Sequence, residues 1–296
     1  MALGNLASRF LVAVVAAPIL LAGFYQKSHV FTFLIVFAAS LIAMWELFSM
    51  LIEDRRDRVA SLVLGGLTVA AHYWLNADAL PRDHTYDVLN NSRPMVMFLG
   101  VLGPGLYYLF RYGDIATVAR RLAATVFGIF YAGILLIMAA ELKRDFAGID
   151  VPRFGDVGGH LIVFVLLVVW FGDTGAYFAG KFLGKAKLYP AVSPKKTWAG
   201  AWGGLAGSLL AGVLMKVIFL DKFFSWTDVI LLTLPGAALA QMGDLVESLV
   251  KRSTGVKDSG AILPGHGGIL DRIDAVLFFV PYVYVYLQLS IFVRGL

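Results

Sequence analysis

The chain has 296 residues, of which 59% are hydrophobic and only 15% are charged, and its mean hydropathy is +0.78. Because soluble domains carry about 25% charged residues, this composition excludes an ordinary soluble protein and predicts an all-α integral membrane protein. The absence of cysteine excludes disulfides and thiolate metal sites, and the net charge of +5 indicates contacts with anionic lipids or phosphates.

About nine segments are long and apolar enough to cross a bilayer as helices, which takes roughly 20 mostly apolar residues each. The third and fourth are short and rich in glycine, so either could be re-entrant. In chain order the segments are 9–25, 30–52, 59–75, 94–110, 121–141, 160–180, 199–220, 228–250 and 273–293.

The distribution of Lys and Arg predicts the orientation of these spans. With the N-terminus inside, most of the 25 Lys and Arg residues fall on the cytoplasmic side. Loops 181–198 and 251–272 are then both cytoplasmic, and they would share a side even if one of the nine spans were false. Charges inside the spans are few before residue 160 and many after it. We therefore expect an N-terminal scaffold over 1–120 and a catalytic region over 121–296.

Two spans carry polar stripes at helical spacing. The first runs along the sixth span, and the second along the eighth. A charge at the bilayer centre costs at least about 2.5–3.5 kcal/mol, so these side chains should face a wet cavity, a cation or one another. The alternative is a structural pair, such as Asp244 with Lys251. The stripes consist of Trp170, Asp173, Thr174, Tyr177 and Lys181, and of Gln241, Asp244, Glu247, Ser248 and Lys251.

A further charge, Glu46, lies near the end of the second span. It could reach the interface or cap a helix, and we favour a structural role for it.

The segment from Ser193 to Trp198 predicts a helix start with a bound anion. Ser193 and Pro194 suit the N-cap and first helical positions. Lys195 and Lys196 would then oppose the helix dipole, which an anion would relieve. This pattern suits a phosphate clamp.

The segment from Ser248 to Asp274 concentrates charge and glycine in an otherwise apolar chain. Its glycines permit close approach of the backbone to a ligand, and its cations can neutralise a polyphosphate. Asp271 and Asp274, placed near Asp244, would form an oxygen-ligand site suited to Mg²⁺ bound with substrate phosphates. These features predict phosphoryl or nucleotidyl transfer at a membrane surface, but they identify neither the nucleotide nor the lipid.

The whole run from Ser248 to Asp274 resembles the signature of the phosphatidate cytidylyltransferases, the CDP-diacylglycerol synthases. The segments around Asp173, Ser193–Trp198 and Gly243–Ser248 are also similar to blocks of that family, and the resemblance extends over about residues 120–290. One departure is Ala199, where the family usually has glutamate, so any role of that glutamate is in doubt here.

The resemblance implies that CTP and phosphatidic acid react to give CDP-diacylglycerol and pyrophosphate, with Mg²⁺ and a possible second cation, K⁺. It also implies membrane lipids and a homodimer as partners, no nucleic acid, and a bacterial inner membrane with the active site facing the cytoplasm. Asp244 and Asp271 resemble the metal carboxylates. The expected site comprises catalytic Lys251, Arg252, Lys257, Asp258, His266 and Arg272; substrate-binding Ser193, Lys195, Lys196, Thr197, Ser248, Gly267 and Gly268; and metal-binding Asp244, Asp271, Asp173, Glu247 and Asp274.

Two other functions remain open at this point. A CTP-dependent lipid kinase would release CDP instead of pyrophosphate. A transporter would place its polar residues near the bilayer midplane and show repeat symmetry, whereas here they gather at the predicted cytoplasmic ends.

Overall fold

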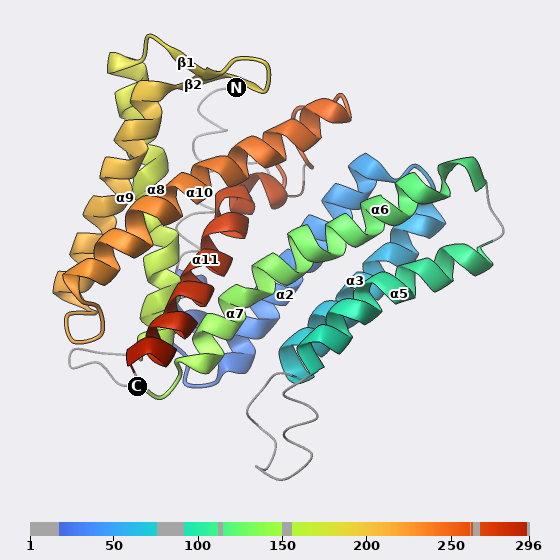
Figure 1. Ribbon diagram of the computed structural model, residues 1–296, viewed down its shortest axis with the longest axis horizontal. Coiled ribbons are helices and arrows are strands. Elements are labelled where there is room, and N and C mark those ends of the chain that lie inside the picture. The colour runs from blue at the N-terminus through green and yellow to red at the C-terminus, as the bar shows by residue number, and fades with distance from the viewer. Residues whose placement is uncertain are drawn as a thin grey trace.

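The computed structural model describes residues 18–75, 92–111, 115–149, 156–260, 262 and 267–294. Within these ranges the protein is a bundle of long helices with a single short hairpin (Figure 1). The elements are α2 (His29–Leu51), α3 (Arg55–Leu75), α5 (Ser92–Phe110), η1 (Ile115–Thr117), α6 (Val118–Gly128), the π-helical η2 (Ile129–Ile134), α7 (Leu135–Asp145), α8 (Val157–Leu183), β1 (Lys187–Tyr189), β2 (Ser193–Thr197), α9 (Trp198–Ile218), α10 (Trp226–Ser253) and α11 (Leu270–Arg294).

The all-α membrane fold is confirmed, but the count of nine spans stays a prediction. Among the described residues, six helices are long and apolar enough to cross a membrane. The third candidate, 59–75, is helical within α3, and the fourth has only a shorter apolar stretch, Val96–Phe110. Residues 9–17 of the first candidate lie outside the described part of the chain. The six spans are His29–Leu51, Ile115–Asp145, Val157–Leu183, Trp198–Ile218, Trp226–Ser253 and Leu270–Ser290.

The described parts of the two loops that we expected to share a side of the membrane lie at one end of the bundle, and their membrane side stays a prediction. Figure 1 shows the β1–β2 hairpin, which joins α8 to α9, at the same end of the bundle as the C-terminal end of α10. The division at residue 120 is not tested by the fold and stays a prediction.

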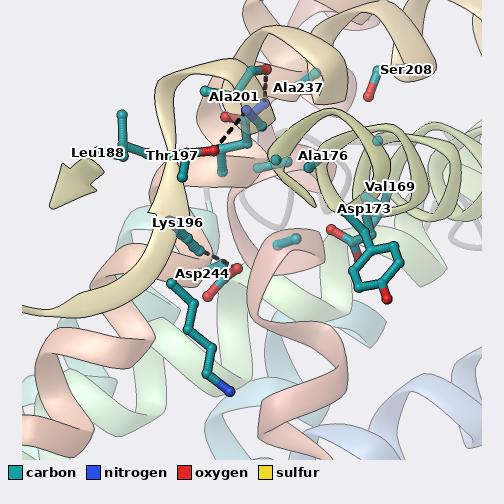
Figure 2. A pocket seen from close by; sticks show the side chains of 18 of the residues that line it. Val169, Asp173, Ala176, Leu188, Lys196, Thr197, Ala201, Ser208, Ala237 and Asp244 are labelled. Carbon is teal, nitrogen blue, oxygen red and sulfur yellow. Dashed lines mark hydrogen bonds and ion pairs between the residues drawn. The ribbon is translucent and has the colours of Figure 1, made fainter. Parts of the chain in front are cut away.

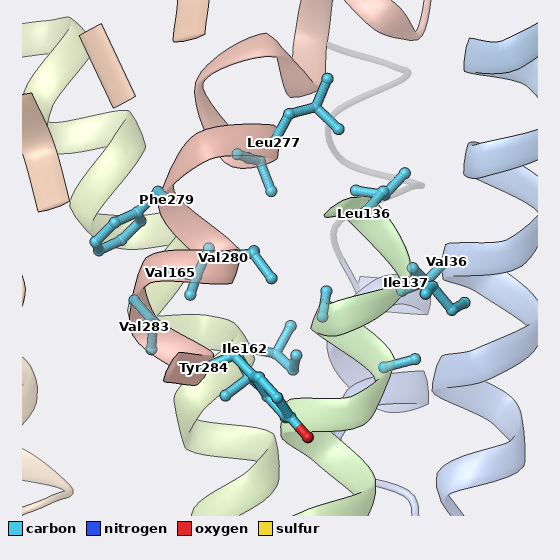
Figure 3. Packing of buried hydrophobic residues seen from close by; sticks show 14 of the residues in the cluster. Val36, Leu136, Ile137, Ile162, Val165, Leu277, Phe279, Val280, Val283 and Tyr284 are labelled. Atoms are coloured by element: carbon cyan, nitrogen blue, oxygen red, sulfur yellow. The ribbon is translucent and has the colours of Figure 1, made fainter. Parts of the chain in front are cut away.

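The core lies where α2, α7, α8 and α11 meet (Figure 3). Leu136 and Ile137 on α7 pack between Val36 on α2 and the α11 residues Leu277 and Val280. In lipid there is little hydrophobic drive for helices to associate, so van der Waals packing of this kind holds them together. This core joins the N-terminal helices to those that carry the predicted site.

Close glycine packing fixes α8 against α9. A Cβ on Gly203 would lie 2.7 Å from the carbonyl oxygen of Gly175, and one on Gly172 would lie 2.6 Å from Ser208 Oγ. Only glycine permits this approach. Gln241 of α10 joins the pair through its Nε2, which donates to the Ala201 carbonyl at 3.1 Å. The three helices are thereby held around one space.

A buried ionic cluster ties α3, α5 and α6 together. Asp57 is fully buried and accepts hydrogen bonds from Arg121 Nη1 at 2.5 Å, Arg111 Nε at 2.9 Å and the Tyr107 hydroxyl at 2.8 Å. Burial would raise the pKa of Asp57, but the hydrogen bonds from Arg121, Tyr107 and Arg111 outweigh it and lower that pKa below its ordinary value.

Candidate active site

A cavity of about 410 Å³ lies between α8, α9, α10 and the hairpin (Figure 2). Its walls are mostly glycine, alanine and other apolar residues, with charged groups at the hairpin end. The lining residues are Val169, Gly172, Asp173, Ala176, Tyr177, Gly180, Lys181, Leu188, Lys195, Lys196, Thr197, Gly200, Ala201, Ser208, Ala237, Ala240, Gln241, Asp244 and Ala275.

The polar stripe on α8 turns only in part toward this cavity. Asp173, Tyr177 and Lys181 line it at a spacing of four residues, which places them on one helix face. Trp170 and Thr174 do not line it, and the Thr174 hydroxyl instead donates to the Trp170 carbonyl at 2.8 Å. Three cavity-lining residues were not among the predicted site residues: Tyr177, Lys181 and, on α10, Gln241. Their positions in the two polar stripes could have indicated that they face the site.

The predicted helix start at Ser193 and Pro194 is wrong. These residues belong to strand β2, which pairs antiparallel with β1 in the register Lys187↔Thr197 and Tyr189↔Ser193. Proline is tolerated in a strand of this kind because every strand of a two-stranded sheet has an open edge. The helix begins at Trp198 instead, with the Thr197 hydroxyl accepting from Gly200 N at 3.1 Å as its N-cap.

The hairpin carries the predicted phosphate-binding lysines to the cavity by a different route. Lys195 and Lys196 both line it from the strand rather than from a helix terminus. Lys196 Nζ contacts Asp244 Oδ2 at 2.6 Å, and Figure 2 shows this ion pair spanning the space between hairpin and α10. The two side chains are 25% and 35% exposed, so the pair remains open to exchange with a ligand.

The suggested structural pair of Asp244 with Lys251 is also wrong. Lys251 Nζ contacts Glu247 Oε2 at 2.5 Å and Asp271 Oδ1 at 2.7 Å. Asp244 lies further toward the cavity, where Ser248 Oγ donates to it at 3.5 Å. The polar stripe on α10 therefore divides, with Gln241 and Asp244 facing the cavity and the last turns facing Asp271.

Asp173 and Asp244 line the cavity, and a third carboxylate, Asp274, lies near them. Asp173, Asp244 and Asp274 lie near enough to repel one another, and Lys196 and Arg272 lie near enough to attract Asp173. Within the described ranges, no three side chains are already arranged to hold a metal ion by themselves. Mg²⁺, however, is ordinarily bound by one or two carboxylates together with water and substrate phosphates. The carboxylates on the cavity side fit that requirement.

Asp271 is differently placed from Asp274, although both lie at the start of α11. Its oxygens accept hydrogen bonds from Lys251 Nζ at 2.7 Å, Ser259 N at 3.0 Å and Gly268 N at 3.1 Å. A carboxylate offers about four lone-pair sites, so most of its capacity is already used. Gly267 takes φ +80, which places Gly268 N for this contact at no steric cost.

Several predicted site residues lie away from the cavity. Arg252 is exposed in the last turn of α10, where its Nη1 donates to the Val256 carbonyl at 3.0 Å. Lys257 and Asp258 are exposed after the end of that helix. Ser248 is only 9% exposed and lies one turn after Asp244 on α10. His266 lies outside the described residues, so its role stays a prediction.

Glu46 has the structural role that we favoured, but at a distant helix. Its buried carboxylate accepts hydrogen bonds from the backbone N–H groups of Ile269 and Leu270 at the start of α11. Its position in the chain gave no signal of this contact, because the partners lie in a different span.

The chain is similar in sequence to a known protein family and to curated bacterial proteins. A model described as the cytidylyltransferase family matches residues 7–290. The phosphatidate cytidylyltransferase of Staphylococcus saprophyticus is 51% identical over 124 residues, which is 42% of this chain and 47% of that protein. The protein of the same name from Bacillus subtilis is 43% identical over 141 residues, or 48% and 52% of the two chains. The chain thus spans about half the length of the curated relatives it matches.

Proposed function

The chain belongs to the cytidylyltransferase family, and we propose that it transfers the cytidylyl group of CTP to phosphatidate, giving CDP-diacylglycerol and pyrophosphate. The observation that carries this proposal is the cavity between apolar helices that Lys195, Lys196, Asp173 and Asp244 line, with Lys196 paired to Asp244. The names of the curated relatives support the choice of substrates. The comparisons give no support to a lipid kinase or a transporter.

The two faces of the cavity suit the two substrates. Its apolar wall of small residues, between Val169 and Ala240, would admit the glycerol end of a lipid from the surrounding membrane. At the hairpin end, Lys195, Lys196 and Lys181 would bind phosphate groups of the lipid and the nucleotide. Bringing two polyanions together is the main obstacle to the reaction, and these lysines lower their repulsion.

Mg²⁺ would be held mainly by Asp244, with Asp173 and Asp274 beside it. A divalent cation in such a site neutralises phosphate charge and that of the departing pyrophosphate. Lys196 forms an ion pair with Asp244 in the structure, so we propose that the lysine side chain moves to the nucleotide phosphates when the substrates bind. Asp271 and Glu247 remain candidate ligands, but both are already paired with Lys251, which would have to stay beside them when a metal ion binds. K⁺ as a second cation is likewise a proposal.

The transfer step requires positioning more than acid–base chemistry. A phosphate oxygen of phosphatidate is already anionic, and it attacks the α-phosphorus of CTP without a general base. One P–O bond forms there, and the bond from the α-phosphorus to the bridging oxygen of the β-phosphate breaks. The electron pair leaves with pyrophosphate, roughly in line with the attack. Lysines fixed on the hairpin and on α8 hold the reactants in this alignment.

We further propose that the hairpin end of the bundle faces the cytoplasm of a bacterium, with the protein in the inner membrane as a homodimer. The Lys and Arg residues around this end, including Arg55, Arg56 and Arg120, support the orientation.

Product analysis tests the proposed function. Purified protein in detergent, supplied with CTP, phosphatidate and Mg²⁺, should release pyrophosphate and form CDP-diacylglycerol in equal amounts. A matched reaction with diacylglycerol in place of phosphatidate should give neither product. Release of CDP with either lipid would show a kinase and overturn the proposal.

A further inference from the structure

A carboxylate from the N-terminal half of the chain lies inside the segment that carries Asp271. Glu46 belongs to α2 and is only 3% exposed. Its Oε1 accepts from Ile269 N at 3.1 Å, and its Oε2 accepts from Leu270 N at 2.8 Å and from Ser259 Oγ at 3.2 Å. These partners follow it by 213 to 224 positions, so the contact is entirely tertiary.

The position of Glu46 makes it an N-terminal cap supplied by another helix. The first N–H groups of a helix have no partner within the helix, and the helix dipole favours negative charge beside them. Caps usually come from the residue just before the helix. Because α11 begins at Leu270, a cap from α2 fixes the start of α11 relative to α2 rather than only relative to its own loop.

The backbone fits closely around this carboxylate. A Cβ on Gly260 would lie 2.5 Å from Glu46 Oε1, and one on Gly268 would lie 2.6 Å from Oε2. Any larger residue would therefore have to displace the carboxylate. At Gly268 the added Cβ would come still closer to Ser259 Oγ, so Glu46 and its partner Ser259 together leave room only for glycine at this position.

The groups that Glu46 holds are the ones that also hold Asp271. Ser259 donates its hydroxyl to Glu46 and its backbone N–H to Asp271. Gly268 packs against Glu46 and donates its own N–H to Asp271. Asp271 in turn contacts Lys251 on α10. A movement of Glu46 would thus pass directly to Asp271 and Lys251.

We propose that Glu46 is a positioning residue for the transfer reaction, which anchors Ser259, Gly268 and the start of α11 and so sets the place of Asp271 and Lys251. This inference rests on the proposed function. Glu46 is not among the residues that line the cavity, and it acts through the residues it holds.

The test compares Glu46→Gln with Glu141→Gln. Glu141 is equally buried, at 1% exposed, and pairs with Arg144 at 3.4 Å on α7. It controls for the loss of a buried carboxylate outside the active site. Because misplacement of about 1 Å costs on the order of 100-fold in rate, Glu46→Gln should lower kcat 10- to 100-fold with little change in the KM for CTP. Glu141→Gln should lower kcat less than about twofold at a comparable loss of thermal stability.

A second variant and a second readout cover the case in which Glu46→Gln fails to fold. Ser259→Ala keeps its backbone N–H for Asp271 but loses the hydroxyl bond to the Glu46 carboxylate. Loss of one hydrogen bond to a charged group corresponds to a fall in kcat of about 12-fold, and of about 160-fold at most. Hydrogen exchange of the amides of 269–271, measured without substrates, should quicken in Glu46→Gln and Ser259→Ala but not in Glu141→Gln.

Equal kcat values in Glu46→Gln and Glu141→Gln, or unchanged exchange at 269–271, would overturn the inference. The two proposals fail separately. If wild-type protein forms no CDP-diacylglycerol, the proposed function is wrong, while the exchange of these amides still decides whether Glu46 anchors the start of α11.

Discussion

Replacement of Lys251 by glutamine probes the buried charges at the end of α10. Lys251 is the cation between Glu247 and Asp271, whose side chains are 1% and 9% exposed. Removing one partner of a buried ion pair costs about 3–5 kcal/mol, because the remaining charge is left without compensation. Here two carboxylates are left, and we expect Lys251→Gln to lower the free energy of unfolding by an amount within that range.

The pair formed by Lys196 and Asp244 is a matched control. Its side chains are 25% and 35% exposed, and exposed pairs contribute about 0–1 kcal/mol. Lys196→Gln should therefore reduce stability by about 1 kcal/mol at most while abolishing most of the activity, since the lysine lines the cavity. A double variant, Lys251→Gln with Glu247→Gln, should recover at least about 1 kcal/mol, because Asp271 keeps its backbone donors.

Reversible unfolding in mixed detergent micelles at increasing SDS measures these free energies, with helicity followed by circular dichroism. The expected order of stability is wild type, Lys196→Gln, the double variant and Lys251→Gln. If Lys251→Gln were no less stable than Lys196→Gln, the buried pairing of Lys251 with Glu247 and Asp271 could not be a source of stability.

Two other substitutions test separate parts of the structure. Gly268→Ala would place a Cβ 2.6 Å from Glu46 Oε2, so we expect the free energy of unfolding to fall by about 1–3 kcal/mol and most of the activity to be lost. Gly105→Ala is the control, because a Cβ there would have nothing within 4 Å, and its stability and activity should be nearly unchanged. Thermal unfolding compares the stabilities of the two variants, and initial rates compare their activities. The pKa of Asp57 is lowered in the folded state, so its stabilisation is complete above its ordinary pKa of 3.8 and is lost as the pH falls through the folded value. Asp57→Asn should accordingly be much less stable than wild type at pH 6, with a smaller difference near pH 3; an equal difference at both pH values in thermal melts would contradict this assignment.

The sequence predicted the fold class and the charged end of the bundle because both follow from local patterns. Asp173 and Asp244 were found because helical spacing places polar residues on one face, and a charge within an apolar helix requires a partner. Lys195 and Lys196 were assigned to phosphate binding from their residue types, and they do line the cavity. The local structure proposed for them was wrong, because Thr197 rather than Ser193 is the N-cap.

The partners of the charges could not be predicted, because they depend on tertiary contacts. Lys251 had Asp244 and Glu247 within reach on its own helix, but Asp271 arrives from α11. Glu46 meets a helix that begins more than 200 residues later, and no local pattern records that contact. The glycines of the segment were interpreted as room for a ligand, whereas Gly260 and Gly268 also make room for Glu46.

We propose that this chain makes CDP-diacylglycerol at the cavity lined by Lys196 and Asp244. The most direct measurement is the initial rate of CDP-diacylglycerol formation from CTP and phosphatidate at increasing Mg²⁺, in wild type, Asp244→Asn and Glu141→Gln. We predict Mg²⁺-dependent synthesis in wild type and Glu141→Gln and a fall of at least about 100-fold in Asp244→Asn, consistent with the loss of a directly contacting group. Asp244→Asn that remained folded and as active as wild type would contradict the claim.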